Sequence, residues 1–207
     1  MSKGFYYFLF TAAIMGSSIL YFKIQRDIKM ENPNLTDLAV EPDILMSTAD
    51  RTLHDHKSQT AIKFLEDAIS TMKLLEKDGD SISTSAIELA IRDLVIVEQH
   101  IKAEDINDDL MYEAFADAMN SLAFASLRIS EQFIQEGKEE EAKVTIEHAM
   151  NHLQNSIKFA RGDQKQDEIR IAAHLQRIID DHSESDISQI DQVMVEIDSV
   201  VRAHVIK

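Results

Sequence analysis

Two histidines come nearest to a chemical motif in this sequence. His148 and His152 are four residues apart, so on a helix they would share one face and could chelate a divalent metal ion. Glu147 is adjacent in sequence, but on a helix it points about 100° away from His148. The sequence contains neither the Glu-x-x-His pairs of di-iron bundles nor a His-Glu-x-x-His zinc motif. We therefore predict no metal site, with His148 and His152 as weak candidates only.

Other residue types that carry out catalysis lack the neighbours that their chemistry needs. Cysteine is absent, which excludes disulfides, thiolate metal ligands and thiol catalysis. The serines between Ser81 and Ser85 lie in no Gly-x-Ser-x-Gly elbow, and no glycine-rich phosphate loop occurs. The acidic stretch 104–109 lacks the ligand spacing and the glycine of a calcium-binding loop. We predict no catalytic residue, no cofactor and no enzymatic activity.

The composition favours long helices and argues against one class of partner. The 207 residues include 5 glycines and 2 prolines, and 44% of them are hydrophobic. Few helix breakers and many helix-forming residues indicate an all-α fold of one or at most two domains. The formal net charge of −16 repels nucleic acid phosphates, so we expect no nucleic-acid partner.

The N-terminal part of the chain contains a long uncharged segment. Residues 4–22 carry no charged side chain, and as a helix they would be about 28 Å long, close to the roughly 30 Å core of a bilayer. Tyrosines lie near both ends of the segment, where aromatic rings favour the membrane interface. A cleaved signal peptide with a site at residues 16–18 is the alternative, but the apolar run continues past that site. We predict a transmembrane helix at residues 4–22, within an anchor region of residues 1–30.

The charges beside this segment bear on which side of the membrane the rest of the chain lies. Lys3 and the α-amino group precede the segment, whereas Lys23, Arg26 and Lys29 follow it. Counting these charges favours a cytoplasmic C-terminal domain by a margin of one. An exported domain is the open alternative.

Both prolines fall just after the anchor region. Pro33 and Pro42 lie in residues 31–46, and proline disfavours helix in an interior and at the preceding residue. We predict a tether at residues 31–46 and an acidic helical domain at residues 47–207.

Six segments of this domain have apolar residues at three- and four-residue steps, which is the periodicity of an amphipathic helix. Ser85 and Glu88 are spaced as a capping box for the second segment, and Asn107 is a suitable cap for the third. The third segment is apolar on more than one face, which is typical of a central helix. Because short connections make neighbouring helices antiparallel, we predict an antiparallel bundle or stack of about six helices. The predicted segments are 47–77, 85–102, 108–136, 139–161, 164–181, and one from 185 or 186 to near the C-terminus.

The stretch 123–156, AFASLRISEQFIQEGKEEEAKVTIEHAMNHLQNS, resembles a tetratricopeptide repeat, a 34-residue helix-turn-helix. Two departures are Ser126 in place of the usual Trp and Gln154 where Pro would end the unit. The resemblance covers roughly one sixth of the chain and implies a protein-binding scaffold. A generic antiparallel hairpin is the alternative, because any such hairpin produces some of these matches. The matching positions are Ile129, Ser130, Phe133, Gly137, Ala142, Ile146 and Ala149.

These observations support three functional hypotheses. The one we favour is a single-pass membrane protein whose helical domain is a non-catalytic protein-interaction or scaffold module. Its expected partners are the bilayer, through residues 4–22, and another protein. A homo-oligomer would follow if one apolar stripe is left uncovered. The alternatives are an exported envelope protein that acts in stress and a metal-binding helical bundle that uses His148 and His152.

Overall fold

The structure of this chain, a computed structural model, describes residues 40–76, 81–180 and 187–205. The chain divides into two compact units, residues 1–37 and 38–207, and every described residue belongs to the second unit. The predicted transmembrane helix at 4–22 lies outside the described residues. Within the described ranges, no helix has the length and apolar character needed to cross a membrane.

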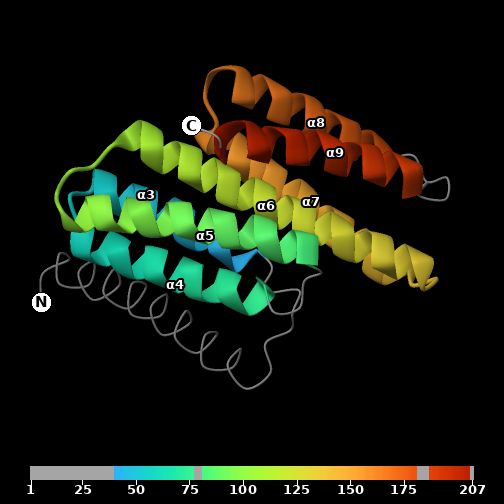
Figure 1. The fold of residues 1–207 in the computed structure, drawn as a ribbon, viewed down its shortest axis with the longest axis horizontal. Helices are drawn as coiled ribbons and strands as arrows, with labels where there is room; N and C mark the ends of the chain where they lie inside the picture. Colours follow the sequence, from blue (N-terminus) through green and yellow to red (C-terminus); the bar gives the residue numbers. More distant parts are fainter. Residues whose placement is uncertain (1–39, 77–80, 181–186, 206–207) are drawn as a thin grey trace, which may run out of the picture. The chain divides into compact units, whose positions relative to one another are not determined.

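Every described element is an α-helix, which confirms the all-α prediction (Figure 1). Consecutive helices pack against each other along the chain, and α9 returns to pack against α6. The helix α6 therefore contacts α5, α7 and α9 and lies in the centre of the bundle. The described helices are α3 (Glu41–His54), α4 (Ser58–Glu76), α5 (Ser81–Lys102), α6 (Asp108–Gln135), α7 (Glu139–Phe159), α8 (Gly162–Asp180) and α9 (Ile187–Val205).

The apolar core consists of two clusters that share α6. The first contains side chains of α3, α4, α5 and the first half of α6, together with Phe159. The second contains side chains of the second half of α6 and of α7, α8 and α9. All residues from 114 to 127 are buried, so α6 is enclosed on all sides over these four turns. This burial confirms the central position that its apolar sequence predicts.

The predicted tether is wrong from residue 41 onward, because α3 begins there. Pro42 lies in the first turn of α3, where a missing backbone N–H removes no helical hydrogen bond. Asp43 and Met46 are buried, so α3 is part of the core. The predicted helix 47–77 is in fact the end of α3 followed by α4. The break lies at the left-handed residue His56, whose φ is 59°.

Local signals fixed some helix ends and not others. Asn107 caps α6 as predicted, with its side-chain oxygen accepting a hydrogen bond from the Leu110 N–H at 3.1 Å. Gly137 ends the α6–α7 turn with a φ of +72°, a conformation that suits glycine. Ser85 is not a cap, because α5 begins one turn earlier at Ser81. Gly162 is the first residue of α8.

The buried face of α8 differs from the prediction. The apolar pattern predicts an inward stripe that begins at Ile169, yet Ile169 is 43% exposed. The buried side chains are instead Gln164, Glu168, Ile171, Leu175 and Ile178. Two of these five are polar, so periodicity of apolar residues alone could not find the face.

Candidate functional site: a buried polar layer

A first group of polar side chains in the core joins α3 to α7. His152 Nδ1 lies 2.9 Å from both carboxylate oxygens of Asp43, and the two side chains are each 1% exposed. Asn155 Nδ2 donates a hydrogen bond to Asp43 Oδ2 at 2.9 Å. With its proton on Nδ1, the imidazole donates to the carboxylate, which fixes the orientation of the ring. Such a pair can hold and exchange a proton.

A second group joins α8 to α6 and α7. Glu168 is fully buried, and it accepts hydrogen bonds from Asn120 Nδ2 at 2.7 Å and from Ser156 Oγ at 2.5 Å. Each oxygen of this carboxylate therefore has a donor, and a buried polar group without one costs about 1–3 kcal/mol. Ser156 follows His152 by one helical turn, so the two groups lie beside each other on one face of α7.

A third contact joins α6 to α8. Asp117 is 5% exposed and accepts a hydrogen bond from Gln164 Nε2 at 3.1 Å. The pKa of Asp117 is raised to about 8, first by burial and then by the nearby carboxylates of Glu113, Asp93 and Glu168. The hydrogen bond from Gln164 lowers this pKa but does not offset the other effects. At neutral pH the Asp117 carboxyl group is therefore mostly protonated.

Together these side chains, all buried except the partly buried Asn155, form a polar layer in the core. We define this polar layer as Asp43, Asp117, Asn120, His152, Asn155, Ser156, Gln164 and Glu168. The layer holds α3, α6, α7 and α8 together by hydrogen bonds. On α6 it lies where the first apolar cluster gives way to the second. Because polar partners must match in direction as well as position, such a layer favours one packing arrangement of the helices. Its carboxyl groups and its histidine are enclosed, so their hydrogen-bond partners are side chains of the protein rather than solvent.

The predicted histidine pair is divided between two environments. His152 is in the polar layer, with Nδ1 facing Asp43. His148 is half-buried, and its pKa is lowered by burial and by His152, against a smaller opposite effect of Glu147. Among the residues that the structure describes, no three His, Asp or Glu side chains are grouped so that they could hold a metal ion.

Sequence reasoning missed most of the polar layer. Asp43 was placed in a tether, and its partner His152 is 109 residues away in the chain. Glu168 does not belong to the apolar pattern of its helix, so the pattern gives no sign that it is buried. A usable signal does exist in α6, where Asn120 lies inside the long apolar run. A polar side chain in such a run must find a buried partner, although the sequence does not say which one.

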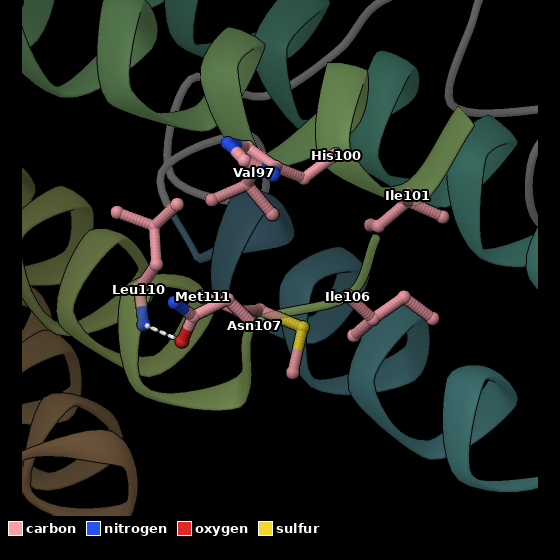
Figure 2. A pocket seen from close by; sticks show the side chains of 7 residues that line it. All are labelled: Val97, His100, Ile101, Ile106, Asn107, Leu110 and Met111. Carbon is pink, nitrogen blue, oxygen red and sulfur yellow. Dashed lines mark hydrogen bonds between the residues drawn. The ribbon is translucent and has the colours of Figure 1, made fainter. Parts of the chain in front are cut away.

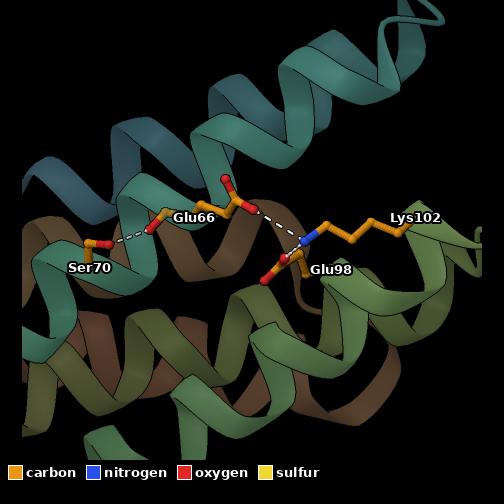
Figure 3. Close-up of polar contacts among 4 residues, drawn as sticks. All are labelled: Glu66, Ser70, Glu98 and Lys102. Carbon is orange, nitrogen blue, oxygen red and sulfur yellow. Dashed lines mark hydrogen bonds and ion pairs between the residues drawn. The ribbon is translucent and has the colours of Figure 1, made fainter.

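Two further features lie on the surface of the bundle. A shallow depression lies at the α5–α6 turn (Figure 2). On the α4 side of α5, Lys102 Nζ pairs with Glu98 and, at 3.2 Å, with Glu66 (Figure 3). These hydrogen bonds raise the pKa of Lys102. The depression is lined by Val97, His100, Ile101, Ile106, Asn107, Leu110 and Met111.

No protein-family model, curated protein or solved structure matches this chain. The resemblance of residues 123–156 to a tetratricopeptide repeat therefore stays a prediction. In the structure this stretch comprises the second half of α6, the turn at Gly137 and most of α7.

Proposed function

We propose that this chain is a single-pass membrane protein whose acidic helical domain binds another protein and does not act as an enzyme. One contrast carries the proposal. The side chains best suited to acid–base chemistry are enclosed in the polar layer, whereas large apolar side chains are exposed on helix faces. Exposed apolar side chains that lie together on one face are typical of protein-interaction sites. The exposed apolar residues include Ile44, Leu74, Ile82, Ile96, Ile106, Val144, Ile169 and Val195.

The anchor proposal comes from the sequence. The uncharged segment 4–22 has the length of a membrane span, and α3 begins at Glu41. The intervening chain of about 18 residues can reach no further than about 60 Å even when fully extended. A domain held in this way would act close to the membrane surface. The flanking charges favour the cytoplasmic side.

Membrane extraction tests the anchor. Full-length chain should stay with the membrane pellet through washes with high salt and with alkaline carbonate, because a membrane-spanning helix is not held by charge. A variant that lacks residues 1–30 should appear in the supernatant. Release of the full-length chain by either wash would contradict the anchor. In a separate experiment, a topology reporter fused after Lys207 decides on which side of the membrane the helical domain lies.

Site-specific photocrosslinking in membranes tests protein binding. A photoreactive side chain placed at an exposed apolar position of the full-length chain, such as Ile96 or Val195, should give a crosslinked protein of defined mass. The same side chain at exposed polar positions, such as Gln59 or Gln166, serves as the matched control. Crosslinks that are equal at both kinds of position, or absent from all of them, would contradict a protein-interaction role.

A further inference from the structure

The helix α5 has a second apolar face in addition to the one that faces the core. Its core side chains include Ile87, Leu94 and Ile101. On another face, Ile82 is 49% exposed and Ile96 is 44% exposed. These two exposed residues and the half-buried Leu89 are spaced by seven residues, so they lie in one line about 21 Å long. We call this line, with Asp93 and His100 between and beyond its large side chains, the outer stripe.

The outer stripe continues into the depression at the α5–α6 turn. His100 belongs to both, since it follows Ile96 by one turn and lines the depression with Ile106 and Leu110 (Figure 2). Ile106 is 43% exposed. The spacing of the stripe suits a helical partner, because apolar residues repeat every seven positions along the seam between two helices.

Carboxylates lie along this surface from Asp93 to the α5–α6 turn. Asp93 lies between Leu89 and Ile96. Burial raises its pKa most; Arg92 lowers it, and Glu113 raises it by less than Arg92 lowers it. Glu113 is one turn beyond Leu110 on α6. The residues around Ile106 include Glu104, Asp105, Asp108 and Asp109, all of them exposed.

The nearest lysine on α5 does not offset these charges. Lys102 pairs with Glu66 and Glu98, on the side of α5 that faces α4 (Figure 3). Arg92 is exposed next to Asp93 and offsets part of this charge. The carboxylates around the outer stripe and the depression still outnumber this arginine, so the surface combines exposed apolar side chains with negative charge.

We propose that the outer stripe and the depression dock a cationic amphipathic helix of another protein. This inference rests on the proposed protein-binding function and names its site and the chemistry of its partner. Apolar side chains of that helix, repeated every three or four residues, would cover Ile82, Leu89 and Ile96. Lysine or arginine between them would lie opposite Asp93 and Glu113.

The negative charge of this surface favours a cationic helix over two other partners, a second copy of the chain and an anionic membrane. A second copy of the chain would bring its own Asp93 and Glu113 to the same surface, and like charges in an interface are unfavourable. An anionic membrane surface is repelled for the same reason. A cationic helix gains both apolar contact and opposite charge, which also steers the encounter.

Peptide binding to the full-length chain in nanodiscs of zwitterionic phospholipid tests the proposal. The probe is a labelled 21-residue helix with Leu at the first and fourth positions of each heptad and Lys at the others. A matched peptide has Glu in place of Lys, and a third has the composition of the first in scrambled order. Fluorescence anisotropy should show binding of the Leu/Lys helix and at least about tenfold weaker binding of both controls.

Substitutions locate the site. Ile96→Glu and Ile106→Glu should each weaken binding of the Leu/Lys helix by about tenfold or more. Ile169→Glu on α8 is the matched control, since Ile169 has nearly the same exposure as Ile96, and it should leave binding within about twofold. The pair Asp93→Asn and Glu113→Gln should weaken binding severalfold and reduce its dependence on salt. Circular dichroism melting of each variant separates loss of binding from loss of fold.

Each outcome has a distinct meaning. Binding that is lost on Ile169→Glu but kept on Ile96→Glu overturns this site while a protein-binding role stands. Binding that no apolar substitution affects is attraction to an acidic protein in general, and it also overturns the site. Crosslinks between two copies through the stripe would assign it to a dimer instead. If no peptide binds and photocrosslinking captures no protein, the proposed function itself fails.

Discussion

The polar layer and the outer stripe of α5 place residue types in opposite environments. In the layer, carboxylates and a histidine are buried and hydrogen-bonded to polar side chains of neighbouring helices. In the stripe, isoleucines are nearly half exposed. A polar side chain in the core requires a matched partner, whereas an apolar side chain at the surface can gain from a partner that arrives later. The comparison suggests that the layer defines the structure and that the stripe is available for binding.

The strongest test of this comparison removes one partner inside the layer. His152→Ala leaves the buried Asp43 carboxylate with Asn155 as its remaining partner, so we expect a loss of about 3–5 kcal/mol in the free energy of unfolding. Urea denaturation measures it. The double variant Asp43→Leu with His152→Leu should recover much of the loss, because no buried charge is left. A His152→Ala variant as stable as the parent would show that the pair is not structural.

A second test uses two residues of α5 that face opposite ways. Leu94 is fully buried, and Leu94→Ala should cost about 2.5–5 kcal/mol because it leaves a cavity. Ile96→Ala, two residues further on, should change stability by less than about 0.5 kcal/mol, since Ile96 is 44% exposed. The same denaturation curves check both variants. A large cost at Ile96 would mean that the outer stripe supports the fold itself.

A third test concerns pH. Asp117 has a pKa of about 8 in the folded chain and an ordinary value of 3.8. Between these values the unfolded chain has released the proton that the folded chain keeps, so this residue makes stability fall as pH rises from about 4 to about 8. In the Asp117→Asn variant the new side chain can still accept the hydrogen bond from Gln164, and it carries no charge. We expect it to be more stable than the parent at pH 8, by about 1–3 kcal/mol, with the difference shrinking toward pH 4.

Urea denaturation of both proteins at pH 5, 6, 7 and 8 measures this difference. Gln166→Ala, at an exposed position of the same helix as Gln164, is a control that should not alter the pH dependence. A difference between Asp117→Asn and its parent that does not vary with pH would contradict the raised pKa.

The smallest effect is expected at Lys102. Lys102 and its partner Glu66 are about half exposed, and although the side chain of Glu98 is 14% exposed, the lysine end of both ion pairs is in contact with solvent. Solvent and salt weaken such pairs. Lys102→Ala should leave the melting temperature unchanged within error at physiological salt. A clear shift would mean that charges outside the polar layer also determine stability.

Much of the fold could be predicted from the sequence because helices are encoded locally. The start of α6 at Asp108, its cap at Asn107 and the turn at Gly137 follow from neighbouring residues. The periodic apolar residues of α5 and α7 also predict most of their buried faces correctly. The boundary at Glu41 failed because a proline was read as a helix breaker when it lies in a first turn.

The polar layer could not be predicted by the same reasoning. Its contacts join residues that are far apart, such as Asn120 and Glu168 or Asp43 and His152, and periodicity contains no information about such pairs. On α8 the buried carboxylate of Glu168 displaced the predicted apolar face by about one residue. The spacing of His148 and His152 is visible in the sequence. It does not reveal that the carboxylate of Asp43, from another helix, contacts His152.

The contact between Asp43 and His152 also has a consequence for the order of events during synthesis. The helix α3 is the first described helix to leave the ribosome, and its polar partner follows 109 residues later. At roughly 5–20 residues per second, this interval lasts roughly 5–20 s. During that time α3 can pack only against the helices already made, with its carboxylate still in water. The earliest helix of the domain is thus among the last to complete its contacts.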